Sequence, residues 1–581
     1  MNSTTDNMEG LQAQFFGWLD FTLFVLMLVL STMIGIYFGF WGKKEDTPKE
    51  YLHGGKTMST IPVAVSLVAS FLSGIMLMGA PTEVYLYGTL YWLVCVAVVF
   101  VAVAMNYIYL PVFYELQLTS TYEYLQLRFS RSVRVIASVL STVGLLLYIP
   151  IVVYVPALAF SQVSGMNVHI ITPAISILCI IYTMLGGIKA VVWTDFLQGF
   201  VMVVASLVVI VLGVIEVGGM GTVWDRSVNG GRIRIFEMSL SPFERLSFWN
   251  VLVGNTFNWI GAIAVNQAMV QKFLSLPTYK KAQISLILLA VELIVITTIS
   301  CYTGLLIFAS YHDCDPITAK TVSRPDQLLP YYVMDIAASI PGLPGLFVAG
   351  IFSAALSTMS SSLNALGATL FEDFIRPCLR NKSSDKTINN IIKCVVVIIG
   401  ALCVLIVFVV DKLGAVLQLT LRAAGVTSGA MVGLFTFGMF YPRGNSKGAL
   451  AGSISSLLLM GWVVFGTQKA TSDGRIKLPA LPVSVKGCAL NVTLPELQTN
   501  DASDDDVFVL YRVSFMYYTL MGIIVVFVVG SVVSLLTEPP DRRNTDPALF
   551  APFMRKYVKE MNTKRYGTTE PAEEELMNKT L

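Results

Sequence analysis

Charged side chains are scarce in this sequence. Of its 581 residues, 13% are Asp, Glu, Lys or Arg, whereas soluble proteins usually carry about 25%. The formal net charge is +2 and no strongly basic stripe is visible, which argues against an electrostatic nucleic-acid binder. Hydrophobic residues reach 55% and the mean hydropathy is +0.70, so the chain lacks the polar residues to cover a water-facing surface.

Metal-binding and catalytic motifs are also missing. The three histidines are scattered, and the eight cysteines form no CxxC pair or Cys/His cluster, which argues against a structural zinc site. No nucleophile–base pair is recognisable, and no loop is large enough to host an enzymatic domain. We therefore predict that the chain is not an enzyme and holds no organic cofactor.

Long apolar runs dominate what is present. A membrane span needs about 20 mostly apolar residues, and about thirteen segments qualify, so we predict an all-α polytopic protein embedded in the lipid bilayer. The segments are 16–38, 57–80, 88–110, 133–160, 168–187, 195–217, 247–274, 282–309, 339–370, 390–410, 414–440, 447–466 and 513–537.

Basic residues in the short loops predict the orientation. They gather after odd-numbered spans, for example at Lys43 and Lys44, whereas loops 81–87 and 161–167 have none. We expect a plasma-membrane protein whose N-terminus is outside and whose C-terminus is inside. Its parts are an extracellular segment 1–15, a leading span 16–38, a ten-span core 57–440, two further spans within 447–537 separated by the extracellular loop 467–512, and a solvated cytoplasmic tail 538–581.

Four glycosylation motifs and two loop cysteines bear on the same orientation. Asn2 and Asn491 fall outside, where glycans can be attached, while Asn381 and Asn578 fall inside and are expected to stay bare. Cys314 and Cys488 also fall outside, where a disulfide between them can form.

Two spans are unusually polar and interrupted by glycine. They cover 64–85 and 249–273, five spans apart, so that each opens a block of five. Paired interrupted helices at matching positions indicate an inverted-repeat transporter with its binding site at the interruptions. The alternative is that these glycines only allow close helix packing.

The ninth span carries the densest run of hydroxyls at membrane depth, within 353–367. Ser357 and Thr358 are adjacent, and the Ala354 carbonyl lies one turn earlier. These oxygens, together with carbonyls freed in a facing broken helix, would suit a sodium ion. The alternative is that the hydroxyls bond back to their own helix or join neighbouring helices.

Eight motifs give a specific resemblance. They are PTEVYLYG (81–88), TSTYEYLQLRF (119–129), YTMLGGIKAVVWTDFLQ (182–198), NQAMVQKFLS (266–275), DCDP (313–316), RPDQLLPYYVMD (324–335), PGLPGLFVAGIFSAALSTMSSSLNAL (341–366) and EDFIRP (372–377). With them the chain resembles the sodium:solute symporter family, in the branch of monocarboxylate, multivitamin and iodide transporters. This implies a leucine-transporter-type fold, with five plus five inverted helices, one extra helix in front and two behind.

The resemblance also implies a sodium site and a coupling ion. Its ligands would be the hydroxyls of Ser357 and Thr358 with the carbonyls of Ala354, Ala69 and Leu72. The chain would need sodium as its coupling ion and no other metal.

Asp195 matches an acidic residue that supports sodium coupling in the family. A simpler interpretation is that Asp195 caps the start of the sixth span, and both roles are compatible.

The substrate residues depart from sugar-carrying relatives. Phe71 and Met76 replace polar residues on the first broken helix, and Ala262 and Ile263 replace an aromatic pair on the seventh span. Gln267 is a further candidate. These replacements therefore argue against sugar and against iodide as substrates, and an apolar pocket would suit a short aliphatic or aromatic body.

Arg422 lies inside the eleventh span, where an ionisable residue is costly and often functional. A guanidinium pairs bidentately with a carboxylate, so Arg422 could hold an organic anion; alternatively it pairs internally, for instance with Glu292, or reaches outward. We predict a sodium-coupled symporter of a small organic anion, a monocarboxylate, working by alternating access. The alternatives are a sodium-dependent biotin or pantothenate transporter and a non-transporting sensor or scaffold.

Overall fold

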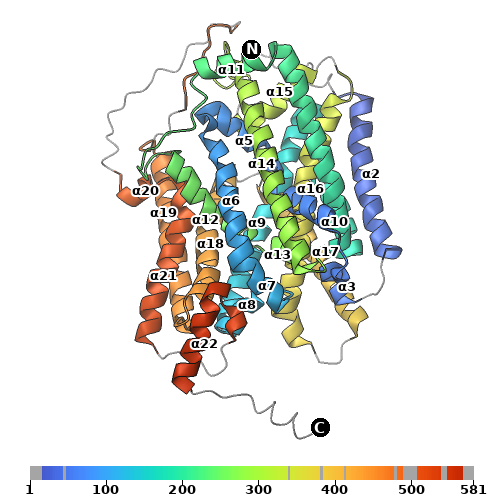
Figure 1. Cartoon of the computed structure of the whole chain (residues 1–581). Coiled ribbons are helices and arrows are strands. Elements are labelled where there is room, and N and C mark those ends of the chain that lie inside the picture. Colours follow the sequence, from blue (N-terminus) through green and yellow to red (C-terminus); the bar gives the residue numbers. More distant parts are fainter. Residues whose placement is uncertain are drawn as a thin grey trace.

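The computed structural model describes most of the chain as a bundle of long helices. The described residues are 16–42, 47–322, 324–337, 340–379, 384–410, 414–476, 480–488, 507–537 and 546–566, and no strand occurs among them. The long helices run roughly parallel to one axis, and the C-terminal helix α22 (Pro552–Tyr566) projects from the lower end (Figure 1).

Each predicted span coincides with helical structure. Two of the spans are made of short consecutive helices, because the chain breaks inside them. In chain order the helices are α2 (Trp18–Phe40), α4 (Thr60–Phe71), α5 (Gly74–Tyr87), α6 (Val94–Ala104), α7 (Leu110–Leu116), α9 (Arg131–Ser164), α10 (Val168–Val217), α12 (Asn255–Ile263), α13 (Gln267–Leu274), α14 (Tyr279–Ser310), α16 (Leu343–Leu370), α17 (Asp385–Val410), α18 (Gly414–Phe440), α19 (Ser446–Ser472) and α21 (Tyr518–Leu536).

Helix α10 holds two of the predicted spans. At 50 residues it would be about 75 Å long if straight, more than twice the thickness of a hydrocarbon core. Its two arms meet at Gly187, whose φ of 57° is left-handed. A Cβ at Gly187 would lie 2.6 Å from the Tyr51 carbonyl oxygen, so only glycine fits this reversal.

The number of helices that are long and apolar enough to cross a membrane is smaller than the number of predicted spans. Among the described residues nine do, or ten if α4 and α5 count as one span bent by 59°. The two arms of α10 count there as one helix, and α12 and α13 are each too short to qualify alone. These features account for most of the difference from the thirteen predicted spans.

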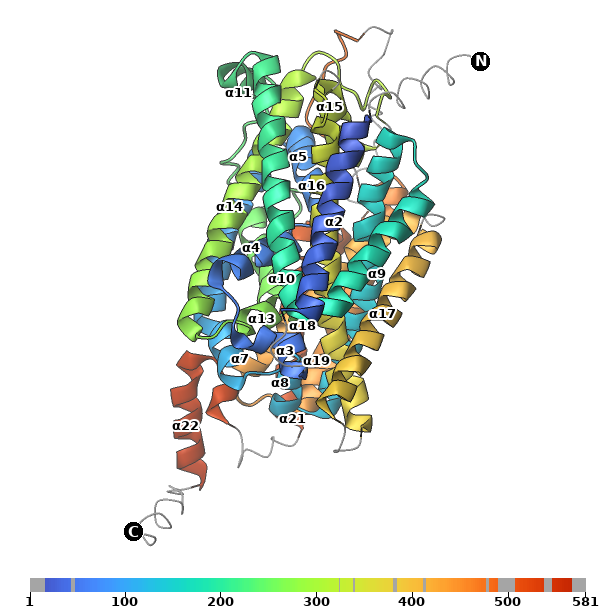
Figure 2. The same ribbon diagram turned by 90° about the vertical axis from the view of Figure 1, so that its right-hand side faces the viewer.

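The core is built of two blocks that each open with a broken helix. The first block holds α4–α5, α6–α7, α9 and both arms of α10, and the second holds α12–α13, α14, α16, α17 and α18. Because four spans lie between them, the broken helices run in opposite directions: α4 and α13 occupy the lower half, and α5 and α12 the upper half (Figures 1 and 2).

The C-terminal segment is less solvated than the sequence predicts. Leu549, Phe550 and Ala551 are buried, and the Ala551 amide donates to the Met439 carbonyl of α18. The Arg128 guanidinium carbon lies 4.6 Å from the centre of the Phe550 ring. The prediction of a wholly solvated tail is therefore wrong for 549–551, because these apolar residues cover a buried arginine.

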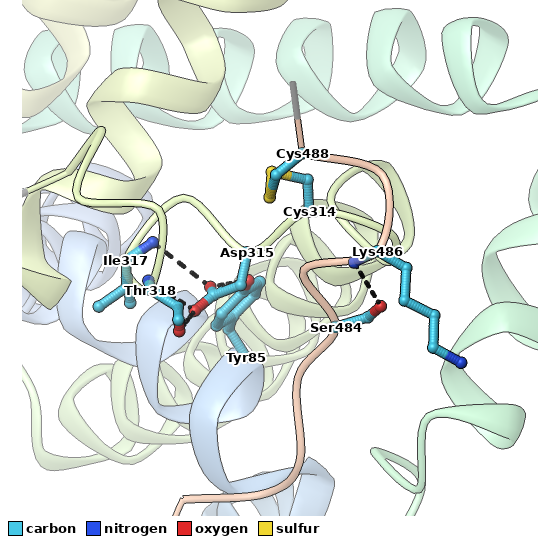
Figure 3. The surroundings of a disulfide bond; sticks show 8 residues. All are labelled: Tyr85, Cys314, Asp315, Ile317, Thr318, Ser484, Lys486 and Cys488. Carbon is cyan, nitrogen blue, oxygen red and sulfur yellow. Dashed lines mark hydrogen bonds between the residues drawn. A yellow bond between two sulfur atoms is a disulfide. The ribbon is translucent and has the colours of Figure 1, made fainter. Parts of the chain in front are cut away.

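The upper face carries the predicted disulfide, between Cys314 and Cys488. The chain around Cys488 also bonds to 313–315: Ser484 O accepts from the Asp315 amide, and the Gly487 amide donates to Asp313 O. Figure 3 shows Asp315 beside Tyr85 at the end of α5, and their Oδ1–Oη distance is 2.5 Å. We call residues 480–488 the strap.

The strap also contacts α5 and the loop after α11 (Met220–Asn229). The Leu481 amide donates to the Leu86 carbonyl, and the buried Arg232 donates from Nε to Tyr85 O and from Nη1 to Pro482 O. The strap therefore holds the upper end of the first broken helix. The loop predicted over 467–512 begins later than expected, because α19 continues to Ser472.

Replacing both Cys314 and Cys488 with serine should loosen the strap. Hydrogen–deuterium exchange of 480–488 should become faster and the melting temperature should fall, because the covalent tie between distant segments is lost. Thiol titration of the denatured wild type should find six free cysteines of eight before reduction.

Replacing the exposed Cys378 with serine is the matched control and should change neither exchange nor melting. Unchanged exchange in the double variant, or eight free thiols in the wild type, would contradict the structure.

Candidate functional site

The first broken helix opens at Leu72 and Ser73. Helix α4 ends when the Leu72 amide donates to Val68 O, and Leu72 has a non-helical ψ of 88°. Ser73 caps α5 by accepting from the Met76 amide, as serine commonly does at a helix start. A Cβ at Gly74 would lie 2.7 Å from the Pro156 ring, so glycine lets α5 approach α9 closely.

This break leaves carbonyls of α4 without their helical partners. One of them meets α16: the Thr358 Oγ1 lies 3.1 Å from Ser70 O and 3.0 Å from Ala354 O. A hydroxyl has one proton and serves one acceptor at a time, so an extra oxygen remains beside Thr358. The Ser357 Oγ lies 3.4 Å from the Ser70 Oγ.

The structure therefore brings the predicted hydroxyls and the first broken helix together. Ser357, Thr358 and Ala354 are buried, as are Ala69 and Leu72 in the facing turn. The carbonyl that α16 contacts directly is that of Ser70, which the sequence analysis did not single out. An ion-binding role for the Ala69 and Leu72 carbonyls stays a prediction.

Asp195 lies at the centre of a hydroxyl cluster. Its side chain is fully buried, with Oδ2 accepting from Ser66 at 2.7 Å and Ser70 at 2.9 Å. From α16, Ser361 reaches Oδ2 at 3.2 Å and Ser360 reaches Oδ1 at 3.3 Å. The N-cap interpretation of Asp195 is wrong, because the second arm of α10 begins just after Gly187 and Asp195 lies inside it.

A lysine supplies the opposite charge. Lys272, on α13, is 2% exposed, and its Nζ lies 2.8 Å from the Asp195 Oδ2. Breaking such a buried pair by removing one partner typically costs about 3–5 kcal/mol. Sequence analysis missed this residue, although a lysine inside a predicted membrane span is itself a functional signal.

An aromatic contact joins the two broken helices. The Phe71 ring at the end of α4 lies 4.4 Å from the Trp259 ring on α12, centre to centre. Phe71 and Met76 are both partly buried, while Ile263 is buried and Ala262 partly so, one turn beyond Trp259. Four of the predicted substrate residues therefore lie on the two interrupted segments.

Gln267 is differently engaged. Its Oε1 accepts from the Thr121 amide at 2.7 Å and its Nε2 donates to Thr119 O at 2.8 Å. The oxygen and the nitrogen of this side-chain amide thus both bind the backbone before α8 (Glu123–Arg128), which argues against a substrate role for Gln267 in this conformation.

Arg422 belongs to α18, but its side chain lies outside the described residues. Its backbone position can still be related to the site. A Cβ at Gly261 of α12 would lie 2.4 Å from the Ser428 Oγ, so α18 packs directly on the second broken helix. Six residues earlier on α18, Arg422 is about 9 Å away along the axis. Its alternative partner, Glu292, lies partly buried on α14.

The structure does not describe the four asparagines of the glycosylation motifs. Asn2, Asn381, Asn491 and Asn578 lie outside the described residues.

The cluster is built of oxygen atoms that come from three helices. Hydroxyl, carbonyl and carboxylate oxygens from α4, α10 and α16 converge, and these are the ligands that hard cations prefer. Among the described residues no group of three or more His, Cys, Asp or Glu side chains could hold a transition metal.

The chain is similar over most of its length to known sodium-coupled transporters. Residues 51–456 match the family model of the sodium:solute symporter family. Sodium-coupled monocarboxylate transporter 1 of Homo sapiens is 40% identical over 542 residues, covering 91% of this chain and 88% of that protein. Sodium-coupled monocarboxylate transporter 2 of Mus musculus is 39% identical over 553 residues, covering 94% and 88%. The sodium/iodide cotransporter of Homo sapiens is 36% identical over 552 residues, covering 92% and 86%.

The solved structure of a Na+-coupled sialic acid symporter shares the fold. It superposes with a TM-score of 0.74 at 23% identity, covering 90% of this chain and 99% of that chain. The architecture is thus the predicted leucine-transporter type, with two inverted blocks of five helices and two broken helices. Since the family model spans most of the chain and these relatives align along most of their length, the chain belongs to the sodium:solute symporter family.

Proposed function

We propose that this protein carries a small organic anion, a monocarboxylate, into the cell together with sodium by alternating access. The observation that carries the proposal is the meeting of Ser357 and Thr358 with the break in the first helix at Ser70. Relatives that are 39–40% identical are sodium-coupled monocarboxylate transporters, which favours this substrate class.

Sodium would bind between α4 and α16, the helices that carry these oxygens. A cation shared by the two blocks favours the conformation in which both contribute ligands, so sodium and substrate raise each other's affinity. Inward movement of one positive charge releases about 2.3 kcal/mol per 100 mV of membrane potential. A monovalent anion moving inward loses the same amount, so the sodium concentration gradient, together with any sodium ion carried in excess of the anion's charge, would drive its uptake.

The anion would bind beside sodium at the two interruptions. Phe71, Trp259 and Met76 supply apolar surface for a short carbon chain or a ring. Arg422 would supply the charge for the carboxylate, since α18 packs against α12 where these residues gather. Gln267 has no place in this proposal, because its amide is already engaged.

The upper face of the bundle would be extracellular and the lower face cytoplasmic, in the plasma membrane. Cys314 and Cys488 form a disulfide on the upper face, which suits an oxidising compartment. Arg128 ends α8, and Arg131 and Arg134 lie in the first turn of α9. Helix α8 lies at the lower end of the bundle (Figure 2), as expected for a cytoplasmic loop rich in arginine.

Removing the two hydroxyls should weaken sodium binding. Ser357→Ala combined with Thr358→Ala should raise the sodium concentration for half-maximal uptake by about tenfold or more, because a tenfold change corresponds to about 1.4 kcal/mol of lost ligation. Uptake is measured against external sodium and normalised to surface abundance. Ser353→Ala is the control on the same helix. An equal loss of uptake and of surface protein would make these hydroxyls structural.

Removing the guanidinium should remove carboxylate transport. Arg422→Gln should abolish sodium-dependent lactate and butyrate uptake at normal surface abundance, since the substrate charge loses its partner. The same cells are tested with nicotinate, biotin, pantothenate, iodide and glucose. Unchanged kinetics would remove Arg422 from the site. Uptake of biotin or pantothenate alone would favour a vitamin carrier, and no uptake of any solute would favour a sensor.

The orientation predicts which asparagines carry glycans. Asn2→Gln and Asn491→Gln should each sharpen and lower the band on a gel, and glycosidase treatment of the wild type should do the same. Asn381→Gln and Asn578→Gln are matched controls that should leave the band unchanged. A glycan at either control position would reverse the orientation.

A further inference from the structure

The ammonium of Lys272 sits in a complete cage of oxygens. Its Nζ lies 2.8 Å from both the Asp195 Oδ2 and the Ser361 Oγ, and 3.1 Å from the Ser66 carbonyl. It also contacts the Ser70 Oγ. An ammonium has three protons for these four oxygens, so the cage offers one more ligand than Lys272 can use.

The same cage adjoins the proposed sodium site. Ser70 is common to both: its hydroxyl contacts Lys272 and lies 3.4 Å from the Ser357 Oγ, while its carbonyl lies 3.1 Å from the Thr358 Oγ1. Two positive charges that share one residue repel strongly where water is excluded. All these side chains are at most 9% exposed, so little solvent screens the repulsion.

Helix α13 carries this ammonium. Its other polar ties are hydrogen bonds: Gln271 Nε2 donates to Leu52 O at 2.7 Å, and Gln267 binds the backbone of Thr119 and Thr121. A cation that enters beside Ser70 would not compete for the acceptors of these neutral hydrogen bonds. It would weaken the contact between the Lys272 ammonium and Asp195, because the cation would compete for the same oxygens.

We infer that Lys272 is a tethered cation that competes with sodium for the oxygens around Asp195 and Ser70, so that sodium entry releases α13. This role rests on the proposed sodium coupling and adds a residue to it. In the sodium-free state the ammonium balances the buried carboxylate and holds the lower half of the second broken helix. Arriving sodium takes over the carboxylate and frees that half to move.

A fixed structural pair is the alternative. In that case Lys272 would neutralise Asp195 throughout the cycle, and its loss would lower the amount of folded protein without changing how the remainder responds to sodium. Competition and fixed pairing therefore differ in sodium affinity rather than in stability.

The first experiment removes the competing charge. Lys272→Met should lower the sodium concentration for half-maximal uptake by about fivefold or more, the lower end of ordinary coupling between sites. Lys272→Arg, which keeps the charge, should stay close to wild type. Lys189→Met is the matched control, because Lys189 pairs with Glu50 outside the cluster. An unchanged half-maximal sodium concentration in Lys272→Met overturns the inference.

The second experiment needs no variant and so does not depend on Lys272→Met folding. Hydrogen–deuterium exchange of the purified wild-type protein is compared in sodium and in choline. Exchange of residues 267–274 should be faster in sodium, because Lys272 has lost its anchor. Equal or slower exchange in sodium overturns the inference.

Different results would overturn the proposed function and the role of Lys272. Wild-type uptake that ignores sodium would sink the proposed function. Sodium-dependent wild-type uptake together with an unshifted Lys272→Met variant would sink only the role of Lys272.

Discussion

The buried carboxylate of Asp195 is the interaction on which the centre of this protein depends. A charge with no exposure to water is stable only if paired and hydrogen-bonded, and here Ser66, Ser70, Ser360, Ser361 and Lys272 provide those partners. The partners come from α4, α13 and α16, while Asp195 itself lies on α10. One side chain thereby joins both inverted blocks, so their relative position is sensitive to any cation that enters.

The broken helices follow from the same requirement for polar partners. In a membrane, irregular backbone persists only where other groups satisfy it. Ser73 caps the start of α5, Asn266 does the same for α13 by accepting from the Ala268 amide, and Thr358 approaches the freed carbonyl of Ser70. One of these groups, the Ser70 carbonyl beside Thr358, also belongs to the proposed sodium site.

The two faces of the bundle are fastened in different ways. On the upper face, the strap and its disulfide hold the end of α5 (Figure 3). On the lower face, Gln267 and Gln271 tie α13 by neutral hydrogen bonds, and Phe550 of the C-terminal segment covers Arg128. The upper end of α5 is therefore hydrogen-bonded to two segments that a disulfide joins, whereas α13 is tied by hydrogen bonds and by the ion pair of Lys272 with Asp195. This difference suits motion at the lower end.

Sequence by itself determined the spans, the paired interruptions, the hydroxyls of Ser357 and Thr358 and the cysteine pair, because apolar length, glycine-broken polarity and motif order are local properties. The family resemblance implies a role for Asp195 in sodium coupling, which stays a prediction. The interpretation of Asp195 as a helix cap was wrong, since a kink at Gly187 is invisible in hydropathy. Only the tertiary structure decided that Lys272 faces Asp195, that Ser70 supplies the contacted carbonyl, and that Gln267 is engaged elsewhere. These outcomes depend on how helices far apart in the chain turn their faces toward one another, which packing settles and local sequence does not.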